Sequence, residues 1–353
     1  MCGISGIISN RDLNHHKLIS LMTGSMSHRG PDFENYKLGN GYSIGHNRLA
    51  IIDLNNRSNQ PFSDNEQRYI MSYNGEIYNY MDLKNELQNS YDFKTNSDTE
   101  VLIAGYKVYG KNILDKINGC FAFAIYDNKK KELFFARDRI GIKPLYFSFL
   151  NGIFIFSSEI TSILETSLVK KEVDKLGIHQ YLTSQSSHYP NTIIKGIKML
   201  NPGSFGVFDH EKSKLSIQKY WRMQIVNKNN ARLDLEKNTV KNVREMVLKA
   251  VEARQISDVK IGAFLSGGVD SSIIVAAMNE LGVKDINTFS LVHEQREFDE
   301  SMYSDLISET FSTNHNKITI GKPEILTSIK EAVDIYDSPS ADGINSYLVS
   351  KKI

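Results

Sequence analysis

The pattern of apolar residues changes once along this chain of 353 residues, and that change constrains the fold more than any other feature. The first two hundred or so residues contain short apolar or alternating runs, such as GISGII, RLAIIDL and CFAFAIY, separated by Gly, Asn and Asp. Such runs predict strands, and helical patterns interrupt them at 80–88 and 99–109. Grouped strands with grouped helices predict sheets covered by helices, an α+β arrangement.

A polar, asparagine-rich stretch, 223–234, separates this part from a second pattern, and we interpret it as a linker. Beyond it, strand-like and helical segments alternate, which is typical of a parallel, doubly wound α/β sheet. We therefore expect one domain at 2–222 and another at 235–353. The final residues, NSYLVSKKI, read as the middle of an amphipathic helix without a cap, so we expect the second domain to be incomplete.

Composition argues against several classes of protein. Lys plus Arg (42) nearly equal Asp plus Glu (41), so charge gives no indication of nucleic acid or an anionic membrane as a partner. No apolar run approaches the ~20 residues that cross a bilayer, and no targeting segment is recognisable, so we expect a cytoplasmic protein. The nine histidines lack the spacing of a zinc site. Of the two cysteines, Cys120 lies in an apolar run and is predicted to belong to the core.

The other cysteine, Cys2, directly follows Met1. Removal of the methionine would leave a thiol and a free α-amino group on one residue. At this point two interpretations are open: an accident of the start codon, or an amine and a thiol that act together. An α-amino group has a pKa of about 7.7–8.0, so its neutral form can accept the proton of the thiol at neutral pH.

The stretch FLSGGVDSS, residues 264–272, lies between a predicted strand and a predicted helix. Paired glycines let backbone N–H groups approach an anion, and the following helix presents its positive N-terminus to phosphate. Serine hydroxyls can donate further hydrogen bonds, and Asp270 can reach a Mg²⁺ ion. The alternative is a tight turn whose serines cap the helix. The order strand, SGGxDSS, helix favours the phosphate loop.

This loop resembles the pyrophosphate loop of ATP pyrophosphatases, which adenylate a carboxyl or carbonyl group. In the first half, MCGI is followed in order by HRGPD, HNRLAIID, YNGEIYN, NSDTE and RDRIGIKPLY. These stretches resemble the class II glutamine amidotransferases, the amino-terminal-nucleophile family. Together, the two halves make the chain from Cys2 to near Ile353 similar to the glutamine-hydrolysing asparagine synthetases. The resemblance implies an αββα glutaminase domain before an ATP-pyrophosphatase domain, with glutamine, aspartate and ATP as substrates and Mg²⁺ as cofactor. It leaves a homodimer open.

The resemblance also implies roles for residues of the first domain. Cys2 would be the nucleophile, and the Asn74 side-chain amide and the Gly75 backbone N–H would form the oxyanion hole. Asp98 would bind the α-ammonium group of glutamine, and Arg48 would bind its carboxylate. The other positions that the resemblance places around glutamine are Leu49, Ala50, Ile51, Ile52 and Glu76.

Taken alone, some of these residues have simpler explanations. The pair Asn74-Gly75 is typical of a hairpin turn, and from the two residues alone we favour that interpretation. Arg48 could form an ordinary surface ion pair. The motif SDTE, 97–100, has the spacing of a capping box, which is compatible with substrate binding by Asp98. The motif HRGPD, 28–32, is expected to shape a turn rather than to contact substrate.

In the second domain, the resemblance places the pyrophosphate of ATP at 266–272 and the adenosine part at Phe264 and Leu291. Phe264 could equally fill the core of the sheet. The residues predicted to contact the pyrophosphate are Ser266, Gly267, Gly268, Asp270, Ser271 and Ser272, with Asp270 also on Mg²⁺. The chain departs from the family in one respect, because a second loop of the type SGxGxDE does not occur in it.

The reaction that the resemblance implies has two stages. First, glutamine is hydrolysed through a Cys2 thioester and releases ammonia, which passes along an apolar passage to the second domain. There, ATP activates aspartate as β-aspartyl-AMP, and ammonia converts this intermediate to asparagine. Three alternatives remain: another carboxylate acceptor, glutaminase activity alone because the second domain is incomplete, or a non-enzymatic channel or regulatory subunit. The intact Cys2, Asn74, Gly75 and SGGVDSS argue against the last alternative.

Overall fold

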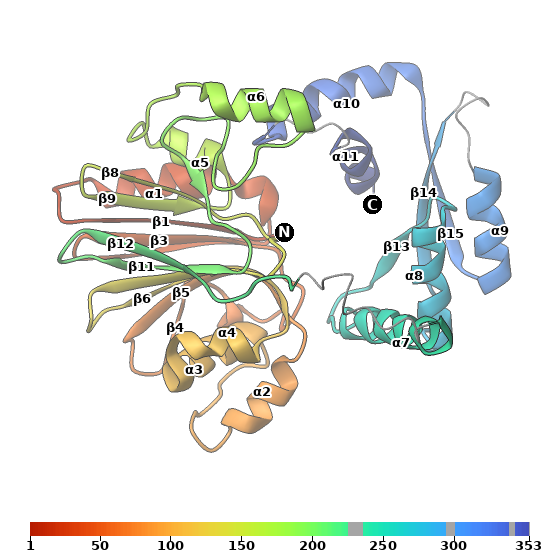
Figure 1. The fold of residues 1–353 in the computed structure, drawn as a ribbon, viewed down its shortest axis with the longest axis horizontal. Coiled ribbons are helices and arrows are strands. Elements are labelled where there is room, and N and C mark those ends of the chain that lie inside the picture. Colours follow the sequence, from red (N-terminus) through yellow and green to blue (C-terminus); the bar gives the residue numbers. More distant parts are fainter. Residues whose placement is uncertain (225–235, 294–300, 339–342, 353) are drawn as a thin grey trace. The chain divides into compact units, whose positions relative to one another are not determined.

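The computed structural model describes residues 1–224, 236–293, 301–338 and 343–352 (Figure 1). The chain divides into two units, Met1–Gln224 and Ile225–Ile353. The linker predicted at 223–234 falls almost entirely outside the described residues. Within the described ranges, no helix is both long enough and apolar enough to span a membrane.

The first unit contains two antiparallel sheets of six strands each. In spatial order, the first sheet consists of β10 (Lys198–Met199), β8 (Tyr146–Leu150), β9 (Ile153–Ser157), β1 (Gly3–Ser9), β3 (Tyr42–Arg48) and β2 (Phe33–Gly39). The second sheet consists of β12 (Lys214–Lys219), β11 (Ser204–Asp209), β7 (Glu132–Arg137), β6 (Gly119–Asp127), β5 (Tyr69–Ile77) and β4 (Phe62–Ser63).

Helices cover the outer face of each sheet, as Figure 1 shows. On the first sheet, α1 (His15–Gly24) packs against β1 and β3, and α5 (Ile160–Glu165) packs against β9. On the second sheet, α3 (Asp98–Tyr109) packs against β5, with α2 (Tyr80–Leu87) and α4 (Ile113–Lys116) beside it. The unit therefore has four layers, helix, sheet, sheet, helix, and the predicted αββα fold is confirmed.

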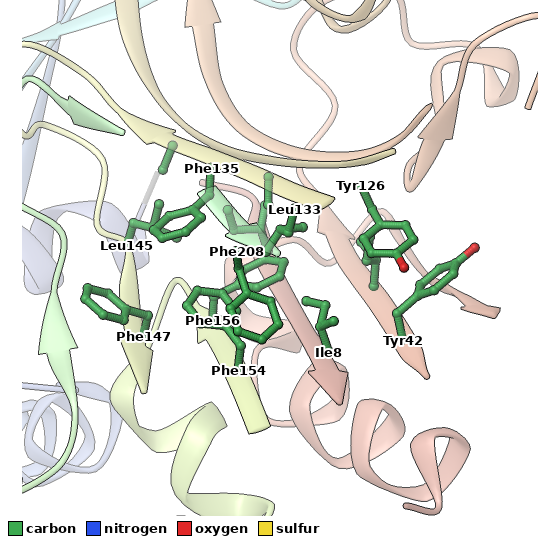
Figure 2. Close-up of a cluster of buried hydrophobic side chains, with 14 of the residues drawn as sticks. Ile8, Tyr42, Tyr126, Leu133, Phe135, Leu145, Phe147, Phe154, Phe156 and Phe208 are labelled. Atoms are coloured by element: carbon green, nitrogen blue, oxygen red, sulfur yellow. The ribbon is translucent and has the colours of Figure 1, made fainter. Parts of the chain in front are cut away.

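Aromatic side chains from both sheets form the core between them (Figure 2). Phe154 of β9 stacks on Phe208 of β11, with ring centroids 5.0 Å apart, and packs at a tilt against Phe135 of β7 at 5.1 Å. Tyr42 and Tyr126 form another tilted pair at 4.2 Å. Interdigitation of this kind holds two sheets face to face. Because helices cover their other face, strands such as β1 are buried along their whole length.

The two helices predicted at 80–88 and 99–109 are confirmed as α2 and α3. Cys120 is buried in β6, also as predicted. Helices α1, α5 and α6 (Lys175–Ser184) lie in the part of the chain that was read only as strand-rich. A signal for α1 does exist in the sequence, because the Asn14 side chain accepts a hydrogen bond from the Lys17 N–H at 3.0 Å and so caps the helix.

The described part of the second unit has a parallel sheet in the order β13 (Gly262–Phe264), β14 (Asn287–His293) and β15 (Asn314–Ile320). Five helices accompany these strands: α7 (Glu236–Ala253), α8 (Val269–Glu280), α9 (Ser301–Phe311), α10 (Lys322–Ile335) and α11 (Gly343–Lys352). Helices α8 and α9 pack against the strands, α7 packs on α8, and α11 contacts β14. The predicted parallel α/β arrangement is confirmed.

Candidate active site

A cavity of about 120 Å³ in the first unit brings together residues from six separate parts of the sequence. It is lined by all of the residues predicted to surround glutamine except Ala50. The backbone N–H of Ala50 instead donates to the Asp32 carboxylate at 2.8 Å. The predicted lining residues are Cys2, Arg48, Leu49, Ile51, Ile52, Asn74, Gly75, Glu76 and Asp98.

The Cys2 thiol is held against the backbone at the end of β3. Its Sγ accepts a hydrogen bond from the Leu49 N–H at 3.4 Å and lies 3.6 Å from the Leu49 carbonyl oxygen. Burial raises the pKa of the thiol above its usual range, although the Leu49 N–H, the α-amino group of Met1 and Lys143 act in the opposite direction. The thiol is therefore protonated at neutral pH.

A buried ion pair fixes the backbone of Cys2. The Arg29 Nε–H donates to the carbonyl oxygen of Cys2 at 3.0 Å, while its Nη1 donates to Glu159 Oε1 at 3.0 Å. His28 Nε2 lies 3.0 Å from the same Glu159 oxygen. Burial raises the pKa of Glu159, but His28 and Arg29 outweigh that effect and the net shift is downward. Arg29 thus contacts the backbone of Cys2 and is not among the residues that line the cavity.

Asn74 and Gly75 lie inside strand β5, so the hairpin turn favoured from the two residues alone is wrong. Gly75 pairs with Phe121 of β6, and a Cβ added there would come within 2.3 Å of the Cys120 carbonyl oxygen. Only glycine allows this approach of the two strands. The Asn74 amide nitrogen is buried and has no acceptor among the described residues.

The edge of β5 also presents a backbone donor to the cavity. In an antiparallel strand, N–H groups point alternately to the two sides. The Tyr73 N–H donates away from β6 to Gln60 at 2.7 Å, and the Ile77 N–H donates to Asp98 at 3.1 Å. The Gly75 N–H, midway between them, points to the same edge, where it lines the cavity beside Asn74.

Asp98 is the first residue of α3 and is almost completely buried. Its Oδ2 accepts hydrogen bonds from the Tyr73 hydroxyl at 2.7 Å and from the Ile77 N–H. Burial raises the pKa of Asp98 to about 6. Ser97 caps the helix through the Thr99 N–H, but the predicted capping box is incomplete, because Glu100 accepts from the N–H groups of 94 and 95 instead.

Arg48 is buried, so the alternative of a surface ion pair is wrong. Four of its N–H groups are engaged by the loop that follows β3. Nη1 donates to the Asn55 carbonyl at 3.0 Å and to the Asn59 side chain at 2.6 Å. Nη2 donates to the carbonyls of Ile52 at 3.3 Å and Asp53 at 2.5 Å. Arg48 therefore shapes the wall of the cavity, and of its five N–H groups only Nε–H is left outside this network.

In the second unit, the stretch 265–268 connects β13 to α8, as predicted for a phosphate loop. Gly267 has φ +83°, and a Cβ there would lie 2.4 Å from the Tyr303 Cβ, so the loop requires glycine. The Ser271 hydroxyl lies 3.1 Å from that of Ser266 and donates to the Gly268 carbonyl at 3.1 Å. Ser272 donates to the same carbonyl at 2.8 Å. The serines thus brace the loop and leave the N–H groups of the first turn for an anion.

The residues predicted near adenosine and Mg²⁺ lie at the same edge of the sheet. Phe264 ends β13 and is 56% exposed, so it does not fill the core. Leu291, in the neighbouring strand β14, is half-buried. Asp270 is exposed in the first turn of α8. Across the described residues, no group of three or more His, Cys, Asp or Glu could hold a metal ion by itself. At this site Asp270 could therefore supply only one ligand to a Mg²⁺ ion, and phosphates would have to supply others.

Comparison with known protein families finds one matching family for each unit. The family described as "Glutamine amidotransferase domain" matches residues 1–221, and the family described as "Asparagine synthase" matches residues 242–353. This chain belongs to the glutamine-hydrolysing asparagine synthetase family.

Named members of this family align with nearly the whole chain. "Asparagine synthetase [glutamine-hydrolyzing] 3" of Bacillus subtilis is 33% identical over 99% of this chain and 59% of its own length. A putative asparagine synthetase of Methanocaldococcus jannaschii is 32% identical over 99% of this chain and 71% of its own length. A second B. subtilis relative, "Asparagine synthetase [glutamine-hydrolyzing] 1", is 35% identical over the whole chain and 56% of its own length. The chain thus spans a little over half the length of the two B. subtilis relatives.

Asparagine synthetase motifs alone do not indicate the whole lining of the cavity. Tyr73, Ser97, Thr99 and Lys143 line it in addition to the predicted residues, and each lies inside a motif quoted for the resemblance. Gln60 also lines it but lies outside those motifs. No local pattern could have indicated Gln60, because its function is to bind the backbone of Tyr73, thirteen residues away.

Proposed function

We propose that this chain hydrolyses glutamine at Cys2 and that the ammonia is used to amidate aspartate, activated by ATP, to asparagine. The observation that supports the first half most strongly is the buried, unpaired Asn74 amide in the cavity that holds the Cys2 thiol. A buried donor without an acceptor destabilises the fold, so its presence beside a nucleophile fits a site that receives a developing negative charge. The names of the relatives suggest the substrates.

The first step needs a chain that begins with Cys2. Once Met1 has been removed, the α-amino group lies on the same residue as the thiol, whose pKa burial raises. The neutral amine accepts the thiol proton, directly or through water, as Sγ attacks the carboxamide carbon of glutamine. A bond forms between sulfur and carbon, and the π electrons of the carbonyl move to oxygen. Arg29 holds the Cys2 carbonyl and so keeps amine and thiol in place.

The Asn74 amide and the Gly75 N–H stabilise the resulting oxyanion. Both lie on β5, whose pairing with β6 fixes their positions before substrate arrives. Collapse of the intermediate breaks the bond between carbon and nitrogen, and the amine returns its proton to the departing nitrogen, which leaves as ammonia. Water then hydrolyses the glutamyl thioester to glutamate and regenerates Cys2.

Recognition of glutamine involves charges already buried in the cavity. The Asp98 carboxylate, oriented by the Tyr73 hydroxyl and the Ile77 N–H, binds the α-ammonium group. Arg48 binds the substrate carboxylate through its Nε–H, which the loop 52–59 leaves available. Alternatively, one of its other N–H groups leaves its acceptor in that loop and donates to the carboxylate instead. The apolar side chains of Leu49, Ile51 and Ile52 contact the methylene groups.

In the second unit, the braced loop and the first turn of α8 bind the pyrophosphate of ATP, and Asp270 is the residue that would hold a Mg²⁺ ion there. The metal would neutralise charge on the phosphates. Phe264 and Leu291 contact the nucleoside. Aspartate attacks the α-phosphorus through its side-chain carboxylate to form β-aspartyl-AMP and pyrophosphate, and ammonia displaces AMP.

Two measurements test the two halves separately. Intact mass of the purified chain reports whether Met1 is absent, and a glutamine analogue with an electrophilic carbon should label Cys2 and not a Cys2→Ala variant. Retention of Met1 in an active chain would contradict the first half. AMP and pyrophosphate formed from aspartate, glutamine and ATP test the second half. Glutamate release without AMP would favour another acceptor or glutaminase activity alone.

A further inference from the structure

Lys143 lines the cavity together with Cys2, but neither the resemblance nor the mechanism above uses it. It belongs to the loop between β7 and β8 and is half-buried. A lysine ammonium group in a cavity lined by protein acts through a lower dielectric than it would in water, so its charge has a larger effect on neighbouring groups.

Two buried charged residues hold the backbone of Lys143 in place. Asp138 Oδ2 accepts a hydrogen bond from the Lys143 N–H at 3.0 Å. The Arg137 Nε–H donates to the Lys143 carbonyl at 2.6 Å. Asp138 Oδ1 further accepts from the N–H groups of Ile140, Gly141 and Ile142 at 3.2, 2.7 and 2.9 Å. Both Asp138 and Arg137 are almost inaccessible to solvent. These hydrogen bonds fix the backbone from which the Lys143 side chain reaches the cavity.

The arginines nearest to Cys2 and the cavity are already engaged. Arg29 forms an ion pair with Glu159 at 3.0 Å, and Arg48 donates four N–H groups to the following loop. Lys143 forms no ion pair within 4.0 Å with any described residue. The remaining charged groups around the nucleophile are Asp32, Glu76 and Asp98.

The positive charge of Lys143 acts on the Cys2 thiol and on the α-amino group at the start of the chain in the same direction. It lowers the pKa of the Cys2 thiol against the larger effect of burial. It also contributes, after burial and Arg29, to the lowered pKa of the α-amino group that Met1 carries in this structure. A cation in the same cavity as Cys2 therefore favours loss of the thiol proton, and it would favour the neutral form of the Cys2 amine in the same way once Met1 has been removed.

We propose that Lys143 is the cation that adjusts the protonation of the amino-terminal nucleophile, a role that deepens the glutamine hydrolysis proposed above and rests on it. Lys143 acts through its charge on Cys2 and is not required to contact glutamine. Replacement by arginine should therefore preserve the function, whereas replacement by an uncharged side chain of similar length should not.

The pH dependence of Cys2 alkylation by iodoacetamide tests this role without requiring turnover. Peptide mapping distinguishes Cys2 from the buried Cys120. In Lys143→Met, we expect the rate profile to move to higher pH by roughly 0.5–1 unit, which makes alkylation about three- to tenfold slower on the acid side. Lys143→Arg should follow the unmodified chain, and so should Lys171→Met, which changes an exposed lysine outside the cavity.

The acid limb of kcat/KM for glutamine should shift in the same direction and by the same amount. Coincident alkylation profiles for Lys143→Met and the unmodified chain would overturn the role of Lys143 while leaving glutamine hydrolysis intact. An unmodified chain that never releases glutamate would overturn the proposed function instead. If Lys143→Met does not fold, Lys143→Gln provides the same neutral charge, and an unshifted profile for it would equally overturn the inference.

Discussion

The two candidate sites of this chain differ in how they expose their polar groups. In the first unit, Asn74 and Asp98 are almost completely buried and belong to a strand and a helix that the core holds in place. In the second unit, Ser266 and Asp270 are exposed on a loop and the first turn of a helix. The buried site suits chemistry in which single groups stabilise a charge away from water. The exposed site suits a ligand whose charge is shared among many backbone donors.

This difference predicts that single substitutions should have large effects in the first site and small effects in the second. The largest effect is expected for Cys2→Ala, which removes the nucleophile. Glutamate release should fall by at least about 10³-fold, since no other group in the cavity can form the thioester. Cys120→Ala, at the buried second cysteine, is the matched control and should keep its activity. Substantial glutaminase activity in Cys2→Ala would remove the contrast between the sites.

The next largest effect should come from Asn74→Ala. Loss of one oxyanion donor is expected to reduce kcat by about 10²–10³-fold with little change in KM, because the contact forms in the transition state. Steady-state glutamate release measures both constants. Asn65→Ala, which removes an exposed amide bound to the Asp92 carbonyl, is the control. A change in KM alone would mean that Asn74 binds ground-state substrate.

Gly75→Ala should weaken the fold itself. Its Cβ would lie 2.3 Å from the Cys120 carbonyl oxygen, so β5 and β6 must separate, which we expect to lower the free energy of unfolding by about 1–3 kcal/mol. Gly24→Ala is the matched control, because nothing lies within 4 Å of the Cβ added there. Urea unfolding of both variants measures the difference. Equal stability would show that the strand pair can absorb the methyl group.

Glutamine binding should weaken as the pH falls through the pKa of Asp98, which is about 6. Above this pH the Asp98 carboxylate is anionic and attracts the α-ammonium group of glutamine. Below this pH the Asp98 side chain is protonated and neutral, so the attraction is lost. Between pH 7 and pH 5, the Kd for glutamine should rise about tenfold. Titration of the Cys2→Ala variant measures binding without turnover. Asp98→Asn should bind weakly with no such dependence, and a steep dependence in Asp98→Asn would assign the titration to another group.

The smallest effect is expected in the second unit, for Ser271→Ala. The hydroxyl braces Ser266 and the Gly268 carbonyl, but backbone donors remain, so ATP affinity should fall only about fivefold, the equivalent of one hydrogen bond of about 1 kcal/mol. Calorimetric titration with ATP measures the change, and glutamate release should not alter. A loss of a hundredfold or more would mean that this site depends on single side chains as the first site does.

Much of the fold followed from local pattern. Alternating runs predicted the strands of the first unit, and strand and helix alternation predicted the parallel sheet of the second. The helix α1 was not predicted, although its Asn14 cap is visible in the sequence, because a single cap is a weak signal beside many strand-like runs. The hairpin turn that the pair Asn74-Gly75 favours when taken alone is wrong, because pairing with β6 overrides the local turn preference of the pair.

The sequence by itself determined the two fold classes, the family and the residue types that meet around Cys2. Periodicity and short motifs carry that information within a few neighbouring residues. The tertiary structure decided the rest: Arg48 is engaged by its own loop, Arg29 and Glu159 are joined across 130 positions, and Lys143 lines the same cavity as Cys2. The physical reason is that burial and charge at a site depend on segments distant along the chain, which come together only when the two sheets pack.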